Sequence, residues 1–133
     1  MKLYRFVGKN ELVALLNGQT IVNNTDYSKQ FDTTSKGFCF FQNNRAKKIN
    51  VIAESALEYL SGIVDVYAII CIEVENARKA RGFYSVGYKT EYNLTEYSKD
   101  VIVNAWLCKT HNFVNEFSGR THTIFDGIGE KVI

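Results

Sequence analysis

The chain has 133 residues, 46% of them hydrophobic and 23% charged, and its sixteen Lys and Arg against fourteen Asp and Glu leave a net charge of +2. This composition is ordinary for a globular protein and excludes a disordered tail, a collagen-like fibre and a coiled coil. The charge is too small to indicate a nucleic-acid or membrane partner by itself. We therefore expect one domain spanning residues 1–133.

The first residues predict a strand followed by a helix. Residues 2–7 are rich in β-formers, with odd-numbered side chains on one face and even-numbered side chains on the other. In the following helix Asn10 is the expected N-cap, Glu11 lies near the positive end of the helix dipole, and Gly18 ends the helix.

A long polar loop separates this unit from the next strand and helix. Residues 19–36 form that loop, with a short strand at 20–22, and loops of this length are often functional. Residues 37–42 predict a buried strand. The strongest helix pattern covers residues 44–61. Its apolar stripe makes two residues part of the core: Ile52 and Leu57.

The C-terminal half is rich in strand patterns. Residues 63–75 predict a central strand with one core face and one mixed face, and residues 76–81 a basic turn or short helix. Residues 108–118 fit a helix or a loop, and residues 126–129 predict a tight terminal turn. The fold class is α+β, with two helices in the N-terminal half and a mixed or antiparallel sheet of about five to seven strands. The remaining strand candidates are residues 82–88, 90–97, 101–107 and 121–125.

Targeting signals and cysteine pairs are absent from the sequence pattern. No apolar run approaches the roughly 20 residues of a membrane span, and residues 1–7 lack the features of a secretion signal. We therefore expect a cytoplasmic protein with no membrane partner. The three cysteines form no Cys-x-x-Cys pair and predict buried, reduced thiols. The abundance of residues with AT-rich codons predicts a low-GC bacterium or its phage as the source.

Motifs with strong chemical meaning are missing. The sequence has no Walker loop, dinucleotide-binding glycine motif, zinc-protease motif or nucleophile elbow. His111 and His122 have no cysteine or carboxylate at ligand spacing, so we expect no metal site.

Four short segments, taken in order, carry a resemblance. They are Leu3-Tyr4-Arg5 on the first strand, Glu11-Leu12 in the first helix, residues 34–41 entering the second strand, and Thr90-Glu91-Tyr92. This order resembles the small ADP-ribosyltransferase-like domains of bacteria and mobile elements. The resemblance covers residues 2–60 and, more loosely, residues 61–100.

The resemblance implies an NAD-binding ADP-ribosyltransferase-like protein that uses NAD⁺ as its substrate and modifies a host protein or nucleic acid. Glu91 would be the catalytic carboxylate near the ribose, where positive charge develops, and Glu96 competes with it for this role. Arg5 would hold a phosphate, and aromatic rings would contact the nicotinamide. The expected cofactor-binding residues are Tyr4, Arg5, Ser35, Phe38 and Phe40.

Other readings of the same residues stay open. Arg5 is equally a strand-edge residue with its charge in solvent, Ser35 a loop hydroxyl, and Glu91 a solvated surface residue. A second function is therefore a non-catalytic phage or mobile-element protein that inhibits a host defence protein by direct binding.

Two basic clusters suggest further anion contacts. Cations in the first turn of the predicted helix 44–61 suggest a phosphate at its N-terminus. A second cluster beside aromatic residues predicts, as a third function, a nucleic-acid-binding module, which the net charge of +2 disfavours. The first cluster comprises Arg45, Lys47 and Lys48; the second comprises Arg78, Lys79 and Arg81 beside Phe83, Tyr84 and Tyr88.

Overall fold

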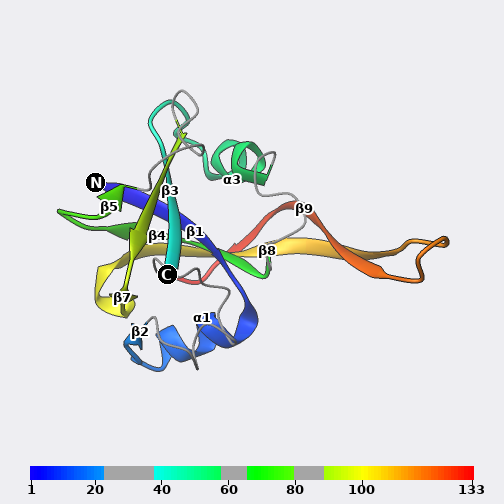
Figure 1. The fold of residues 1–133 in the computed structure, drawn as a ribbon, viewed down its shortest axis with the longest axis horizontal. Coiled ribbons are helices and arrows are strands. Elements are labelled where there is room, and N and C mark those ends of the chain that lie inside the picture. Colours follow the sequence, from blue (N-terminus) through cyan, green and yellow to red (C-terminus); the bar gives the residue numbers. More distant parts are fainter. Residues whose placement is uncertain (23–37, 58–65, 80–88) are drawn as a thin grey trace.

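The computed structural model describes residues 1–22, 38–57, 66–79 and 89–133, which form an α+β domain (Figure 1). The elements are β1 (Lys2–Val7), α1 (Lys9–Leu16), β2 (Ile21–Val22), β3 (Phe38–Asn43), α3 (Ile49–Leu57), β4 (Ala68–Glu73), β5 (Arg78–Lys79), β6 (Lys89–Leu94), β7 (Glu96–Tyr97), a 3₁₀ turn (Lys99–Val101), β8 (Ile102–Val114) and β9 (Thr121–Lys131). Seven strands form one sheet in the order β5-β6-β3-β1-β4-β8-β9, and β2 pairs with β7. The predicted α+β class with two helices and an antiparallel sheet is confirmed for the described residues.

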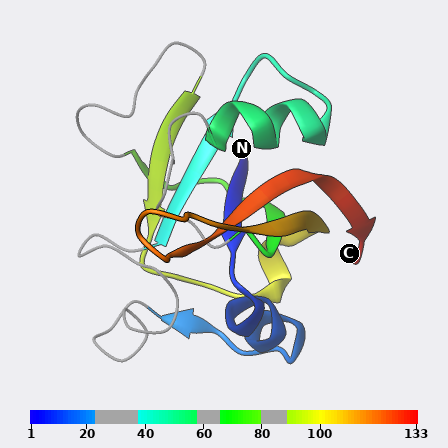
Figure 2. The same ribbon diagram turned by 90° about the vertical axis from the view of Figure 1, so that its right-hand side faces the viewer.

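The two helices cover opposite faces of the sheet (Figure 2). Odd-numbered residues of β1, such as Leu3, pack with α1 in one core cluster, and Phe6 packs with α3 in the other. This division follows from the alternation of side chains along an extended strand. The predicted faces of residues 2–7 are therefore confirmed.

Strand β4 lies inside the sheet between β1 and β8, as predicted. Ala68, Ile70 and Ile72 are buried on the α1 side, while Ile69 and Cys71 are buried on the other. The second face is mixed, as expected: α3 packs against Ile69, whereas Tyr67 and Glu73 are exposed. Residues 63–65 lie outside the described part of the chain.

The two helix starts differ from the predictions. Helix α1 has Gly8, not Asn10, at its N-cap. Helix α3 begins at Ile49 rather than at residue 44, because the Asn43 side-chain oxygen accepts hydrogen bonds from the Arg45 and Ala46 N–H groups at 3.0 and 2.9 Å. That local turn replaces the first helical turn. The basic cluster beginning at Arg45 therefore precedes α3 instead of occupying its first turn.

The C-terminal strands are longer than predicted. Strand β8 continues through residues 108–114, which the sequence left between helix and loop, and β9 includes residues 126–129 instead of a terminal turn. The pairing of β8 with β9 extends both strands. Gly127, whose φ is +125°, allows the register shift beside it, because glycine adopts positive φ without a steric cost. The predicted strand at residues 82–88 lies outside the described residues.

The outer part of β8 and β9 forms a two-stranded arm, defined here as residues 109–126. Strand β4 pairs with β8 between Ile102 and Leu107. Beyond that point β9 is the strand partner of β8 among the described residues. Figure 1 shows the arm projecting well beyond both helices and the other strands.

Candidate functional site

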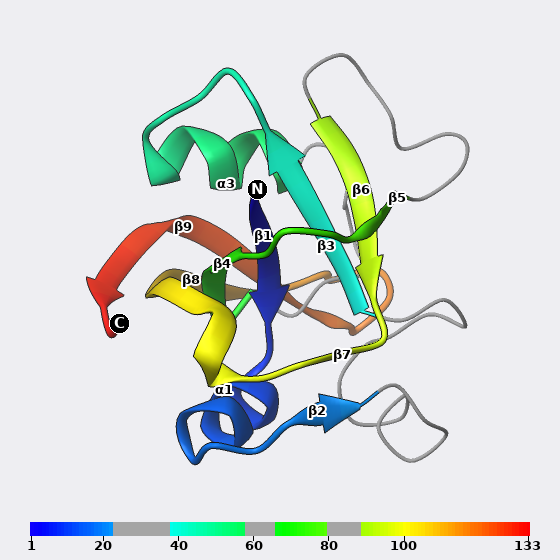
Figure 3. The ribbon, with the colours of Figure 1, turned by 90° about the vertical axis from the view of Figure 1, so that its left-hand side faces the viewer.

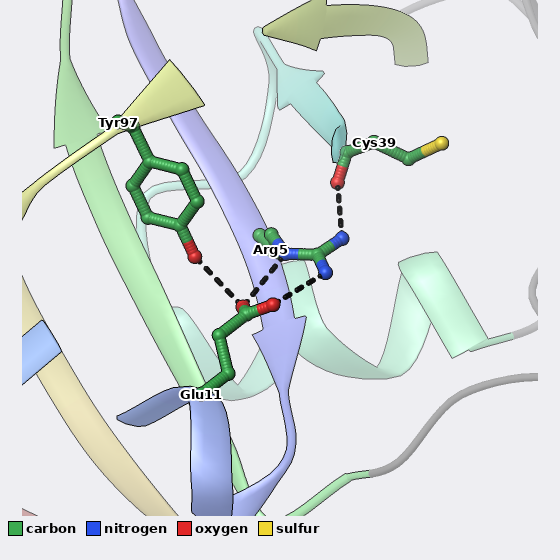
Figure 4. Close-up of polar contacts among 4 residues, drawn as sticks. All are labelled: Arg5, Glu11, Cys39 and Tyr97. Atoms are coloured by element: carbon green, nitrogen blue, oxygen red, sulfur yellow. Dashed lines mark hydrogen bonds and ion pairs between the residues drawn. The ribbon is translucent and has the colours of Figure 1, made fainter. Parts of the chain in front are cut away.

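A buried ion pair joins β1 to α1 beneath the sheet. Arg5 is only 5% exposed, and it donates from Nε and Nη2 to the two carboxylate oxygens of Glu11 at 2.9 and 2.8 Å (Figure 4). Two parallel hydrogen bonds of this kind fix both distance and orientation. Glu11 reaches the guanidinium because it lies in the first turn of α1, immediately after β1 (Figure 3).

Further groups complete this cluster. The Tyr97 hydroxyl donates to Glu11 Oε2 at 2.7 Å, and Arg5 Nη1 donates to the Cys39 carbonyl at 3.3 Å (Figure 4). The guanidinium carbon lies 5.2 Å from the Phe38 ring centroid and 5.9 Å from that of Phe40. The buried cluster, which we define as Arg5, Glu11 and Tyr97, thus connects β1, α1 and β7 and lies against the β3 aromatic rings.

The cluster keeps its charges despite burial. Burial disfavours the charged guanidinium of Arg5, but the hydrogen bonds and negative charge of Glu11 outweigh this effect, so the pKa of Arg5 lies above its ordinary value. The pKa of Tyr97 is raised well above its ordinary value, because its hydroxyl is buried and because Glu11 lies beside it. The cluster therefore contains an ion pair and a neutral phenol.

The sheet separates the residues expected to form a nucleotide site. Arg5, Phe38 and Phe40 share the face covered by α1. The strand register places Tyr4 opposite Phe41, and Phe41 opposite Glu91, so Tyr4 and Glu91 share the other face.

The two candidate catalytic carboxylates lie on different strands. Glu91 is half-buried on β6, whereas Glu96 is exposed on β7 opposite Val22. Ser35 lies outside the described residues. The alternative that Arg5 is a solvated residue at the edge of the sheet is wrong, because β1 lies between β3 and β4 and α1 covers its odd-numbered side chains.

Sequence reasoning did not find the partners of Arg5. Glu11 was placed near the helix dipole but not against Arg5, and Tyr97 was not selected. Tyr97 is 86 residues from Glu11, so no local pattern connects the two. One signal in the sequence could have indicated the Arg5–Glu11 pair: Glu11 lies in the first turn of the helix that directly follows the strand carrying Arg5.

The tip of the arm is an ordered turn that displays an aromatic ring. The Asn115 side-chain oxygen accepts hydrogen bonds from the N–H groups of Phe117 and Ser118 at 2.9 and 3.2 Å. The Gly119 N–H donates to the Asn115 carbonyl at 2.8 Å, and its φ of +69° suits glycine. Phe117 stands at this turn with 102% exposure.

One face of the arm carries alternating apolar and imidazole side chains. The register places Phe113 opposite His122 and His111 opposite Ile124, so these four residues share a face. Phe113 is 53% exposed. At the base of the arm, His111 Nδ1 lies 2.6 Å from a carboxylate oxygen of Asp126.

Comparisons with known proteins do not assign the chain to a family. No family model, curated protein or solved structure matches the chain. In the described ranges, no helix is long and apolar enough to cross a membrane. Among the same residues, no three His, Cys, Asp or Glu side chains gather to hold a metal ion.

Proposed function

We propose that this protein acts by binding another protein and that the tip and the Phe113 face of the arm carry the contact. The supporting observation is Phe117, whose ring is fully exposed on a turn held by three hydrogen bonds to Asn115. A rigid turn reduces the entropy lost when a side chain is immobilised in a complex. Buried aromatic anchors dominate the affinity of many protein interfaces.

The charge of the arm favours a protein over a nucleic acid. Its basic residues Lys109 and Arg120 are balanced by Glu116 and Asp126. Binding to nucleic acid depends on several cations that neutralise phosphates. A balanced arm with apolar residues at its tip and on one face suits an apolar recess on a protein. A host defence protein is the partner that the second function predicts.

The test compares binding before and after removal of the tip ring. The immobilised protein is incubated with lysate of its native host, retained proteins are identified, and their affinity is measured by calorimetry. Because burial of a phenylalanine contributes about 1.5–3 kcal/mol, Phe117→Ser should weaken binding about tenfold or more. Val13→Ser, which removes a 46% exposed apolar side chain from α1, is the matched control.

Two results would reject this function. One is the absence of any retained protein. The other is a partner whose affinity is unchanged by both Phe117→Ser and Phe113→Ser.

An NAD-type function is the second candidate, favoured by the guanidinium of Arg5 beside the rings of Phe38 and Phe40. A phosphate would have to compete with the Glu11 carboxylate for Arg5. This candidate proposes an ADP-ribosyltransferase-like protein, and it expects calorimetry to detect NAD⁺ binding by the parent chain. Because Glu91 lies on the other face of the sheet from Arg5, Glu91→Gln should preserve this binding. No binding at millimolar NAD⁺ would reject it.

A further inference from the structure

The outer edge of β9 has no strand partner in the part of the chain that the structure describes. Strand β9 is the last strand of the sheet, and the described residues place no strand beyond it. The Asn115 N–H donates to the Arg120 carbonyl at 2.9 Å and closes the arm. Since hydrogen-bonded and non-hydrogen-bonded pairs alternate along an antiparallel ladder, the backbone groups of the Val114–Thr121 and Asn112–Thr123 pairs point away from the arm.

Over residues 121–125 this edge lacks the usual barriers to pairing. Natural edge strands are protected by charged side chains, proline or bulges. Residues 121–125 contain no Asp, Glu, Lys or Arg, and the chain has no proline. Protection begins at the register shift that leaves Asp126 without a β8 partner, and it continues where the Ile128 N–H donates to the Asn50 side chain of α3 at 3.2 Å. Among the described residues, the edge is therefore covered near the domain and open along the arm.

We propose that this edge of β9 pairs, antiparallel, with the same edge of a second copy of the chain. The two-fold axis passes through Thr123, so that Thr123 of each copy faces Thr123 of the other. The backbone groups of Thr123 point outward and can exchange two hydrogen bonds across the axis. An isologous pairing of this kind closes on itself as a dimer and does not propagate.

Charge complementarity selects this register. Positions equidistant from Thr123 face each other along residues 121–125. Just beyond them, Arg120 of one copy comes near Asp126 of the other, where the register shift of β9 begins, and this contact occurs twice. Both side chains are exposed. Moving the axis by one residue would instead place Arg120 opposite an apolar residue, Ile124 or Ile128. The carboxylate of Asp126 retains acceptor capacity beside His111.

The pairing also solves a stability problem of the arm. A two-stranded ribbon without further cover is only marginally stable in water, whereas additional strands stabilise it. Two paired arms form a four-stranded ribbon with the two domains at its opposite ends. Figure 1 shows that the arm projects away from the other elements of the domain. The edge used here is separate from Phe117, so the dimer does not depend on the proposed function.

The first test measures the mass of the full-length protein by sedimentation over a concentration series. The parent should change from monomer to dimer as its concentration rises. Thr123→Pro removes an outward N–H without touching the β8–β9 ladder, and should weaken the dimer about tenfold or more. Thr110→Pro makes the same change on the β8 edge and should leave the dimer intact. A circular dichroism spectrum matching the parent's shows that each variant is folded.

The second test reads the register directly. In mild oxidant Thr123→Cys should cross-link to itself, because facing residues in a hydrogen-bonded pair have Cα atoms about 5.5 Å apart, within disulfide range. Thr121→Cys should not, and the parent chain measures the background of the native cysteines. Arg120→Glu should weaken the dimer, and combining it with Asp126→Arg should restore it.

Several outcomes overturn the proposal. The parent remains monomeric at all concentrations, or Thr110→Pro disrupts the dimer while Thr123→Pro does not. Equal cross-linking at positions 121 and 123 also rejects the register. A monomer that still binds its partner through Phe117 rejects the dimer while leaving the proposed function intact.

Discussion

Two polar side-chain pairs of the described residues have nearly equal lengths and opposite surroundings. Arg5 and Glu11 meet at 2.8 Å with side chains 6% and 2% exposed, whereas His111 and Asp126 meet at 2.6 Å with side chains 56% and 41% exposed. Distance alone would rank the two pairs as equals. Exposure to solvent distinguishes them. Water screens the exposed pair, so this pair contributes little to stability, whereas each charge of the buried pair needs the other to compensate for its lost hydration.

The largest expected effect comes from removing one charge of the buried pair. Glu11→Leu leaves the Arg5 guanidinium buried without its carboxylate and should lower the free energy of unfolding by about 3–5 kcal/mol. Replacing the whole cluster, with Arg5→Met, Glu11→Leu and Tyr97→Phe, should recover most of this loss. Urea unfolding at pH 8 measures both variants. A single variant as stable as the parent would show that the pair is not buried as described.

A smaller effect is expected from the third member of the cluster, and it depends on pH. Tyr97→Phe removes a hydroxyl that donates to Glu11 and should cost about 1–3 kcal/mol at pH 8. The folded-state pKa of Tyr97 is raised above its ordinary value, so its stabilising contribution is complete below about pH 10 and declines above it. The difference between parent and variant should therefore narrow toward pH 11. A difference that grows with pH would contradict this assignment.

The smallest effect is expected at the exposed pair. Asp126→Asn removes the carboxylate facing His111, and its cost should stay within about 1 kcal/mol because both groups remain in contact with water. Raising the salt concentration should reduce this cost further. Thermal unfolding at low and high salt measures it. If Asp126→Asn lowered the free energy of unfolding as much as Glu11→Leu, the exposed and buried pairs would not differ in their contribution to stability.

The sequence predicted best where one face of an element is buried. Alternation in residues 2–7 predicted β1 and its faces, because the core selects apolar side chains on a strict period. The start of α3 was predicted at residue 44, whereas the helix begins at Ile49. The turn formed by the Asn43 side chain depends on hydrogen bonds, and a hydrophobic pattern does not indicate them.

The arm illustrates the opposite case. Most of the arm side chains are exposed on both faces, so residues 108–118 carry no period that distinguishes strand from helix or loop. In the candidate site, the partners of Arg5 could not be predicted for a different reason. Arg5 was selected as a phosphate ligand, but its contact with Glu11 depends on how α1 turns back against β1, and its link to Tyr97 crosses most of the chain.

The central position of β1 has a consequence for synthesis on the ribosome. Strand β1 is translated before β3 and β4, which flank it in the finished sheet, so nascent chains that end before β4 leave one side of β1 without a neighbour. Unpaired strand edges of this kind attract chaperones and other chains. The Arg5 charge is neutralised early, since Glu11 follows it by six residues, whereas the sheet around it closes only after residue 73 has left the exit tunnel.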